Sequence, residues 1–582
     1  MKVKLINDSF KNCDYGRALI SSRGVEDIDT YLAPTEENLQ TWKDLENIEK
    51  GIDLIYNLKD NAKIGLIVDC DVDGYTSSVI IYQYLKQIKP NLTIEHYLHT
   101  GKAHGLEEHW SEISGKDYDL LIIPDAGSND EKYSTQITCP ILIIDHHIID
   151  EPALSTNLII INNQISPKYL NKDLSGAGMV YQFCRGLDEK FNVDYSKNYI
   201  DLAALGICGD MMSGLEIENQ YFWRKGFTNI NNFFFMSIAQ EQCYSITGKR
   251  TLSDKEIMNY LTPMSVAFYV VPMINAMVRV GSQEEKERMF IAFIDGHRQV
   301  PSLKRGAKGT YEEAAIEAVR ECVNARSHQN KFKETMTDML EQKILKNDLL
   351  ENQILFIRLE DEEDFPSELN GLIATQLANK YKKPTIVARL NNEGIIRGSI
   401  RGVANSELQS FKEYLLSTGL FEYVQGHDGA AGCSINNKNL SRLHEVANKE
   451  LIKYNLGEDY YEVNFERFSN DKDLTELISN LNKYKFVWSH KNQEALIYVK
   501  SIQITKNDIQ IMGKNSDTVK IFKNGVAYMK FFATDMIQEL NEYDEIVLEV
   551  VGKANLNEWN GTSTPQIFIE NYEIRKNNIL EF

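Results

Sequence analysis

The stretch Gly65-Leu-Ile-Val-Asp69-Cys-Asp71-Val-Asp73-Gly74 decides the fold of this chain. Its apolar start predicts a buried strand over Ile64–Val68 that runs directly into three aspartates at alternate positions. Because alternate residues of an extended chain face the same side, Asp69, Asp71 and Asp73 are expected to converge beyond the strand. Three adjacent carboxylates repel one another unless a cation neutralises them, so the stretch predicts a site for one or two hard divalent ions.

A calcium-binding EF-hand loop is the alternative interpretation of this stretch, since the aspartates and Gly74 match its positions 1, 3, 5 and 6. Position 12 of such a loop requires a bidentate glutamate, and here it is Ile80. The preceding element also has the pattern of a strand rather than a helix. We therefore favour a strand-to-helix metal site, with a turn at Gly74 and a helix over Thr76–Lys89.

Length and composition indicate a multidomain cytoplasmic protein. The chain has 582 residues, enough for three or four domains, and 43% of them are hydrophobic. The eight cysteines form no C-x-x-C pair, which favours reduced thiols over disulfides or zinc. No signal peptide is predicted at the N-terminus, and Pro272 interrupts the longest apolar run, Val266–Met277, so no membrane span is predicted either. The net charge of −21 excludes indiscriminate coating of nucleic acid, but it does not exclude a nucleic-acid enzyme.

Strands and helices alternate from residue 64 to residue 212, which predicts a parallel sheet with helices on both faces. In such a sheet, ligands bind beyond the carboxyl ends of the strands. Helices are predicted near Glu107–Ile113, from Ser175 onward and over Tyr199–Met212. The strands predicted after Ile64–Val68 are Leu92–Tyr97, Leu120–Pro124, Ile141–Ile144 and Leu158–Ile161.

Acids and histidines follow three of these strands, at the edge where ligands are expected. Asp69 follows the first strand, Asp125 follows Pro124, and Asp145-His146-His147 follows Ile144, while Asp210 follows an apolar helix. Each residue also has an ordinary structural interpretation. Asp125 could cap a helix, His147 could be a hydrogen-bonded histidine, and Asp210 could be an acid at a helix end. A shared metal site explains all of them at once.

These residues resemble the four motifs of the DHH phosphoesterase superfamily and, more narrowly, its RecJ-like family of single-strand-specific 5′→3′ DNA exonucleases. Three further stretches carry the resemblance across nearly the whole chain. They are Pro272-x-x-Asn275-Ala276-x-x-Arg279, Gly398-Ser399-Ile-Arg401 and Gly426-His427-x-x-Ala430-Ala431-Gly432.

The expected fold class is α/β, with a parallel-sheet DHH domain, a long helical connector, a DHH-associated α/β domain and a C-terminal OB-type β barrel. The connector is expected as one or two helices, because its sequence is rich in Glu, Lys, Ala and Leu without Pro or Gly. The predicted domains are a helical cap at 1–50, the DHH domain at 51–309, the connector at 310–350, the DHH-associated domain at 351–455 and the barrel at 456–582.

The predicted barrel carries a local excess of positive charge. Between Asn482 and Phe531 there are nine lysines and three acids, and six aromatic residues lie among them. A basic groove with stacking aromatics suits single-stranded nucleic acid. The alternative is that the aromatics form the core and the lysines a solvated face. The aromatic residues are Tyr484, Phe486, Trp488, Tyr498, Phe522 and Tyr528.

The resemblance implies a two-metal site with separate ligands for each ion. Asp69 and Asp71 are expected to hold one ion, and Asp73, His146 and Asp210 the other, with Asp125 bridging. His147 is then expected to meet the scissile phosphate, and Asp145 to orient a histidine. Asp-rich ligands with an imidazole suit Mn²⁺ or Mg²⁺.

The resemblance also implies a pocket for a 5′ phosphate formed by Arg279, Ser399 and Arg401, with Asn275 and His427 as lining residues. The alternative for both arginines is a structural salt bridge. Where the family carries an arginine ahead of a Gly-Tyr-Gly segment, this chain has His99-Thr-Gly101-Lys102-Ala-His104-Gly105. His99 and Lys102 are therefore the candidates for that phosphate contact, and end recognition is expected to be weaker or rearranged.

The leading hypothesis is a monomeric exonuclease that degrades single-stranded DNA from its 5′ end to 5′-mononucleotides, in repair or recombination. A helicase or a single-strand-binding protein is a candidate partner. A second hypothesis changes the substrate to short oligonucleotides, a cyclic dinucleotide or an inorganic phosphoanhydride, for which the extra basic domain is unnecessary. A third is a non-catalytic replication scaffold, which the intact set of acids disfavours.

Overall fold

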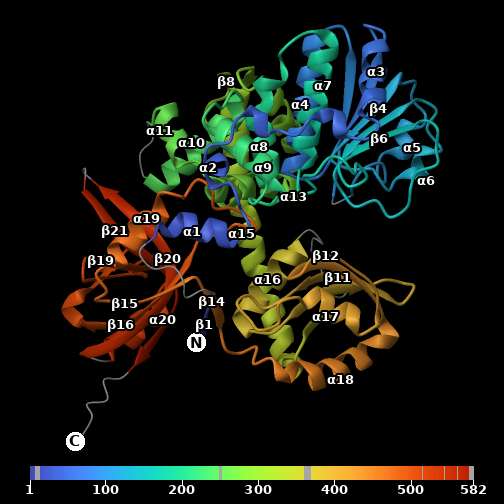
Figure 1. The fold of residues 1–582 in the computed structure, drawn as a ribbon. Helices are drawn as coiled ribbons and strands as arrows, with labels where there is room; N and C mark the ends of the chain where they lie inside the picture. Colours follow the sequence, from blue (N-terminus) through green and yellow to red (C-terminus); the bar gives the residue numbers. More distant parts are fainter. Residues whose placement is uncertain are drawn as a thin grey trace, which may run out of the picture. The chain divides into compact units, whose positions relative to one another are not determined.

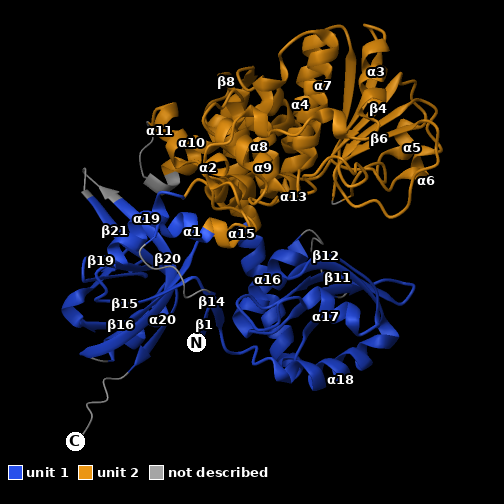
Figure 2. Ribbon diagram, viewed as in Figure 1, with its two compact units in different colours: residues 1–19, 330–484, 494–582 blue, residues 20–329, 485–493 orange. Residues whose placement is uncertain are grey.

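The computed structural model describes residues 1–6, 13–101, 103–247, 252–359, 369–513, 515–542, 544–559 and 562–575. The chain forms two compact units, coloured separately in Figure 2. The first unit comprises residues 1–19, 330–484 and 494–582, and the second comprises residues 20–329 and 485–493. The predicted division into five domains stays a prediction.

The second unit contains an all-parallel five-stranded sheet with the strand order β3-β2-β4-β5-β6. This confirms the predicted α/β fold with a parallel sheet. The strands are β2 (Lys63–Val68), β3 (Thr93–Leu98), β4 (Leu120–Pro124), β5 (Ile141–Asp145) and β6 (Leu158–Asn162).

Both faces of this sheet are buried, which explains why its strands are continuous apolar runs. Leu66 and Ile122 belong to the core on one face, while Ile67 and Ile123 belong to a separate core on the other. Figure 1 shows helices on both sides of the strands. They are α3 (Ile48–Asn57), α4 (Val72–Ile88) and α7 (Gly176–Phe191) on the first face, and the short α5 (Trp110–Ile113) and α6 (Glu131–Ser134) on the second.

The strand order creates a switch point between β2 and β4. The chain leaves β2 for β3 on one side and then returns to β4 on the other. In parallel sheets, ligands bind at such a point, beyond the carboxyl ends of the two strands. Asp69 follows β2 and Asp125 follows β4, so the sequence places a carboxylate at the end of each strand.

Helix α4 begins earlier than the sequence predicted. Asp71 is its N-cap and accepts a hydrogen bond from the Gly74 N–H at 3.0 Å, so Asp73 and Gly74 lie in the first helical turn. The expected turn at Gly74 is therefore wrong. Glycine is needed there for a different reason, because a Cβ atom at this position would lie 2.6 Å from the carbonyl oxygen of Asp69.

Further helices of the second unit complete its larger core. Among the described residues, one helical stretch, Pro263–Val280, is long and apolar enough to cross a membrane by composition, but half of it is buried within the protein. Met273, Ile274 and Met277 on its buried side belong to the core. The helices are α8 (Ile200–Gly209), α9 (Ile217–Gly226), α10 (Phe233–Thr247), α11 (Asp254–Tyr260), α12 (Pro263–Ser265), α13 (Val271–Val280) and α14 (Gln283–Ile294), with a π-helical segment at Val266–Val270.

The predicted connector is one helix, α15 (Ala314–Lys346), which is 33 residues long. In the first unit a mixed sheet follows, with the order β12-β13-β11-β10-β9, in which only β9 and β10 pair in parallel. Its elements are β9 (Leu355–Leu359), α16 (Asn370–Tyr381), β10 (Thr385–Leu390), β11 (Ile395–Arg401), α17 (Phe411–Ser417), β12 (Phe421–His427), β13 (Ala430–Asn436) and α18 (Leu440–Glu450).

The C-terminal region forms a seven-stranded sheet with the order β15-β16-β20-β21-β19-β18-β17. Its β-rich character is confirmed, whereas closure into an OB-type barrel stays a prediction. The sheet is mixed rather than wholly antiparallel, because helix-containing crossovers make β15–β16 and β19–β21 parallel. Its elements are β15 (Phe465–Phe468), α19 (Leu474–Asn482), β16 (Leu496–Thr505), β17 (Ile509–Met512), β18 (Thr518–Lys523), β19 (Val526–Lys530), α20 (Thr534–Asn541), β20 (Glu545–Trp559) and β21 (Thr562–Arg575).

The N-terminus differs from the predicted helical cap. Strand β1 (Lys2–Leu5) pairs in parallel with β14 (Tyr460–Val463), and only then do α1 (Tyr15–Ser22) and α2 (Ile28–Leu32) follow. Alternating Lys and apolar residues at the start of the chain are typical of an edge strand, so this signal was present in the sequence.

Residues 485–493 fall within the predicted C-terminal domain but pack within the second unit. The buried Tyr31 hydroxyl accepts hydrogen bonds from the side-chain amides of Gln220 at 2.9 Å and Asn492 at 2.8 Å. The same two amides donate to the carbonyl oxygen of Val487 at 3.2 and 3.1 Å. The Tyr31 hydroxyl therefore secures this segment to the unit that contains the parallel sheet.

Tyr31→Phe is expected to lower the free energy of unfolding by about 1–3 kcal/mol, because it leaves two buried amide donors short of an acceptor. The exposed Tyr56 provides a matched control, and Tyr56→Phe is expected to change stability little. Thermal and urea unfolding measure the difference. Equal stability of the two variants would show that the hydroxyl does not secure residues 485–493.

Candidate metal centre

Asp69, Asp71 and Asp125 form an oxygen-rich cluster at the switch point of the parallel sheet. One carboxylate oxygen from each lies within 4.8 Å of the others, close enough for all three to bind one ion. Asp69 and Asp125 are buried, and Asp71 is the N-cap of α4. Burial, together with the charges of Asp69 and Asp73, raises the pKa of Asp71 to about 6.

Asp125 occupies a strained backbone position at the end of β4. Its φ of 67° lies in the left-handed region, and its N–H donates to the carbonyl oxygen of Ile144 at 2.8 Å. Burial and the neighbouring carboxylates of Asp73, Asp71 and Asp69 raise the pKa of Asp125. Strain and uncompensated charge at one residue are typical of a functional site.

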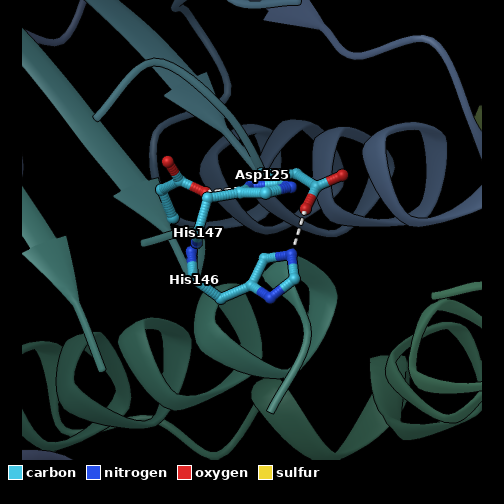
Figure 3. A group of neighbouring side chains, drawn as sticks. Asp125, His146 and His147 are labelled. Carbon is cyan, nitrogen blue, oxygen red and sulfur yellow. Dashed lines mark hydrogen bonds and ion pairs between the residues drawn. The ribbon is translucent and has the colours of Figure 1, made fainter. Parts of the chain in front are cut away.

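A second cluster joins Asp73, His146 and Asp210. The His146 Nε2 atom lies 3.9 Å from Asp73 Oδ2 and 3.5 Å from Asp210 Oδ2. It also lies 3.2 Å from Asp125 Oδ1, and Figure 3 shows the imidazole directed towards that carboxylate. Asp125 thus belongs to the first cluster and lies beside His146 of the second, while its role as a bridging ligand stays a prediction.

The N-terminus of α7 holds Asp73 in place. Its carboxylate accepts hydrogen bonds from the N–H groups of Gly176 at 2.6 Å and Ala177 at 3.0 Å, and from the Ser175 hydroxyl at 2.8 Å. Gly176 permits this approach, since a Cβ atom there would lie 2.3 Å from Asp125 Oδ1. The close spacing of the two carboxylates therefore depends on a glycine.

His147 is paired with Asp145 and reaches solvent. Its Nδ1 atom donates to Asp145 Oδ1 at 2.8 Å, and Asp145 also accepts from the N–H groups of Ser128 and His146. Although burial opposes it, this pairing raises the pKa of His147 to about 9. His147 is thus a hydrogen-bonded histidine at Nδ1, as the alternative interpretation expects. Its side chain is nevertheless 54% exposed.

The donor set fits divalent metal ions. Asp69 Oδ1, Asp125 Oδ1 and His146 Nε2 are buried and have no hydrogen-bond partner among the described residues. Buried polar atoms are normally satisfied, so these unsatisfied atoms within the two clusters indicate a further ligand. Carboxylate oxygens with one imidazole suit Mg²⁺ or Mn²⁺. The calcium-loop alternative does not fit, because a strand, β2, precedes Asp69.

Comparison with known proteins identifies the family. Residues 63–207 match the model of the DHH family, N-terminal domain. The chain is 35% identical to YorK of Bacillus subtilis (strain 168), an SPbeta prophage protein whose name provisionally assigns it as a single-strand DNA-specific exonuclease. That match covers 99% of this chain and 98% of YorK. The chain belongs to the RecJ-like family of the DHH superfamily.

More distant RecJ proteins agree with this assignment. The RecJ-like chain is 21% identical to the single-stranded-DNA-specific exonuclease RecJ of Bacillus subtilis (strain 168), over 98% of this chain and 69% of that protein. Its fold matches the crystal structure of RecJ from Thermus thermophilus in complex with Mn²⁺ with a TM-score of 0.69, at 16% identity. That alignment covers 99% of this chain and 79% of the solved one.

In the RecJ-like chain, Arg279 and Asn275 lie one helical turn apart on α13, so their side chains share a face. Arg279 has no ion pair within the described ranges, which leaves the salt-bridge alternative without support. Burial lowers the pKa of Arg279, and the charge of Asp71 opposes this shift.

Ser399, Arg401 and His427 lie together on the mixed sheet of the first unit. Arg401 on β11 and His427 on β12 both pair with Ala430 on β13. Arg401, Ala430 and His427 therefore form one row across the sheet. Ser399 lies two residues before Arg401 and shares its face. The Arg401 guanidinium donates to the Thr375 hydroxyl at 3.1 Å. The proposed roles of these residues stay predictions.

His99 and Lys102 are the residues predicted to contact the 5′ phosphate in place of the arginine of the family pattern. His99 is fully enclosed, with its imidazole between Glu108 and Asp69, so its placement gives no support to a direct phosphate contact. Lys102 lies outside the described residues.

Sequence reasoning missed His104 as a neighbour of the centre. Its Nδ1 atom lies 2.8 Å from Asp69 Oδ2, and this hydrogen bond raises the pKa of His104 to about 11. His104 lies in the segment His99–Gly105, which departs from the family pattern. That departure was the feature of the sequence that could have identified it. The helix N-terminus that holds Asp73 left no signal beyond the glycines of Ser175-Gly-Ala-Gly178.

The aromatic residues between Asn482 and Phe531 agree in part with the alternative interpretation, in which they are buried. Trp488, Tyr498 and Tyr528 are buried, whereas Phe522 is 52% exposed. Several lysines of this region are neutralised by acids. The pairs are Lys491–Asp173, Lys500–Glu466, Lys506–Asp544 and Lys523–Asp508.

Proposed function

We propose that this RecJ-like chain is a divalent-metal-dependent exonuclease that degrades single-stranded DNA in the 5′→3′ direction to 5′-mononucleotides, in DNA repair or recombination. The observation that carries the proposal is the pair of adjacent donor clusters, Asp69–Asp71–Asp125 and Asp73–His146–Asp210. The names of the relatives support single-stranded DNA as the substrate. We expect a cytoplasmic monomer, with a helicase or single-strand-binding protein as a candidate partner.

The two clusters would hold two Mn²⁺ or Mg²⁺ ions, with Asp125 as the proposed shared ligand. Such ions would supply the charge that activates a water, holds the phosphate and stabilises the leaving oxygen. The protein fixes the distances between the carboxylate and imidazole ligands. Hydrogen bonds from α7 fix Asp73, and the backbone at the end of β4 fixes Asp125.

His147 is the residue proposed to meet the scissile phosphate. Its Nδ1 proton is committed to Asp145 at 2.8 Å, so Nε2 is the atom left to act on the substrate. A protonated imidazole donates a hydrogen bond to a phosphate oxygen and stabilises the charge that develops during cleavage. Asp145 orients the ring and keeps it cationic, the role expected of a buried carboxylate behind a histidine.

The function is tested with a single-stranded oligonucleotide labelled at its 3′ end and incubated with Mn²⁺. A descending ladder that is absent from a blunt duplex of the same sequence establishes polarity and strand preference. Release of 5′-mononucleotides, identified chromatographically, establishes the product. Absence of cleavage with every divalent ion tried would favour the non-catalytic scaffold.

Arg279→Gln is expected to weaken binding of 5′-phosphorylated strands about tenfold while changing turnover at saturation less, because a guanidinium contributes charge-assisted hydrogen bonds to a terminal phosphate. The matched substrate is the same strand with a 5′ hydroxyl, for which a smaller effect is expected. KM and kcat for both strands measure the difference. Equal losses for the two strands would contradict the assignment.

A second candidate substrate is a short oligonucleotide. It is favoured by the burial of three of the interleaved aromatics, which leaves fewer rings for base stacking along a long strand. Comparing kcat/KM for strands of increasing length separates the two. A rate that rises with length favours the long single strand, and a rate that falls favours the short substrate.

A further inference from the structure

The His99 imidazole is built into the wall of the metal centre. It follows directly after β3, and none of its side chain is exposed. Its Nδ1 atom lies 3.1 Å from Glu108 Oε2, a hydrogen-bonding distance. A histidine whose Nδ1 hydrogen is committed to a carboxylate presents Nε2 as a free electron pair, the arrangement common behind metal-bound imidazoles.

The surrounding chain fixes this imidazole from two directions. Glu108 also accepts from the Thr100 N–H at 3.0 Å and from the Thr100 hydroxyl. From α14, the buried Lys286 ammonium donates to the carbonyl oxygens of His99 at 3.1 Å and Thr100 at 2.9 Å. The Gln283 amide donates to the carbonyl of the preceding residue, Leu98, at 2.8 Å. Three successive backbone carbonyls are thus held, and the Glu108 carboxylate orients the ring.

His99 Nε2 and Asp69 Oδ1 face each other across 4.0 Å. Both atoms are buried, and neither has a hydrogen-bond partner among the residues that the structure describes. Two ligands that are each about 2.1 Å from one divalent ion lie at most about 4.2 Å apart. The separation of these two unsatisfied atoms therefore suits donors to the same ion.

We propose that His99 Nε2 and Asp69 Oδ1 are ligands of the same divalent cation, with Glu108 as the residue that orients His99. This inference rests on the proposed function, because it adds a ligand to the metal centre described above. It gives the centre an imidazole in each cluster, His99 in one and His146 in the other. The family pattern has an arginine ahead of this segment, so the ligand is specific to this chain's departure from that pattern.

Two neighbouring histidines are weaker candidates for the same role. His104 already donates to the other oxygen of Asp69 at 2.8 Å, and 62% of its side chain is exposed. His109 packs its ring against His99 with centroids 4.8 Å apart. A separate ion among His99, Glu108 and His109 would compete for Nδ1 of His99, which already lies within hydrogen-bonding distance of Glu108.

The added imidazole has a consequence for metal preference. Nitrogen ligands favour Mn²⁺ and later transition ions, whereas Mg²⁺ prefers oxygen. His99→Gln is therefore expected to lower Mn²⁺ affinity by about tenfold or more while leaving Mg²⁺ affinity nearly unchanged. Calorimetric titration of the full chain with each ion measures both. Equal losses for the two ions, or no loss for Mn²⁺, would overturn the proposal.

A spectroscopic test identifies the ligand directly. In a His146→Gln background, pulsed electron paramagnetic resonance of bound Mn²⁺ is expected to retain the coupling of one coordinated imidazole nitrogen. Adding His99→Gln is expected to remove that coupling, whereas the matched control, His104→Gln in the same background, keeps it. Loss of the coupling with the His104 variant, or its absence from the His146→Gln protein, contradicts the proposal.

The two proposals fail in different ways. If the unmodified chain binds no Mn²⁺ and cuts no DNA, the proposed function fails. If the unmodified chain binds Mn²⁺ and cleaves single strands, but the His99→Gln protein shows the same Mn²⁺ affinity and nitrogen coupling, only the His99 ligand fails.

Discussion

Asp125→Asn is expected to reduce cleavage of single-stranded DNA by about 10³-fold or more while leaving the fold intact. One Asp125 carboxylate oxygen lies 3.2 Å from His146 Nε2 in the second cluster. Asp125 also lies close enough to Asp69 and Asp71 for all three carboxylates to bind one ion. An amide presents a neutral oxygen in place of a charged one, so both proposed ions would lose a ligand charge at once. Rates on the 3′-labelled strand in Mn²⁺ measure the loss, and a rate within tenfold of the unmodified chain would contradict the bridging role.

Asparagine is the better replacement at this position because the φ of Asp125 is 67°. Asparagine tolerates the left-handed region, whereas alanine adds strain of about 1–2 kcal/mol. With alanine, a loss of activity caused by lower stability could not be separated from a loss caused by the missing ligand. Without metal, Asp125→Asn is expected to melt at the same or a higher temperature, because it relieves the burial and repulsion that raise the pKa of this carboxyl. The stabilisation normally gained on adding Mn²⁺ is expected to shrink, which melting curves with and without the ion detect.

Gly206→Ala is expected to cost about 10²-fold in cleavage although Gly206 is not itself a ligand. On helix α8, a Cβ atom at this position would lie 2.3 Å from Asp73 Oδ1 and 2.5 Å from the Ala177 Cβ atom. Relief of that overlap displaces Asp73 from the N-terminus of α7 and misplaces one ligand of the second cluster. Overpacking also lowers stability, by about 1–3 kcal/mol.

Gly186→Ala separates displacement of the ligand from simple overpacking. Gly186 is a buried glycine of α7, and a Cβ atom there would meet the Ile52 Cδ1 atom at 2.4 Å, away from the acids. This control is expected to lower the melting temperature without a matching loss of cleavage at temperatures where it is folded. If both variants lose activity in proportion to stability, the close packing around Asp73 has no specific role.

The sequence carried enough information to predict the parallel sheet and the edge at which its acids gather. Continuous apolar runs predicted strands buried on both faces, and the polar residues directly after them marked the carboxyl ends. The position of Asp125 and of Asp145-His146-His147 in the structure agrees with that reasoning, because it depends only on where each strand ends. The family resemblance, carried by motifs along nearly the whole chain, is confirmed by the comparisons.

Other features depend on contacts between residues distant in sequence, which local patterns do not encode. The hydrogen bonds that hold Asp73 come from Gly176 and Ala177, more than one hundred positions away. His99 was predicted as a phosphate contact because its enclosure by Glu108 and α14 has no signature in the local pattern. The burial of Trp488 among residues of another part of the chain likewise left it looking like a surface aromatic.

The packing of residues 485–493 against Tyr31 and Gln220 bears on how this chain can be shortened. A truncation at residue 455 follows the predicted boundary of the C-terminal domain, yet it removes Asn492 and the carbonyl of Val487, the partners of those buried side chains. Such a fragment would expose the surface on which the buried Trp488 side chain rests, and it is expected to aggregate on expression. A soluble fragment that contains the parallel sheet therefore needs residues 485–493, either within the chain or as a separate peptide.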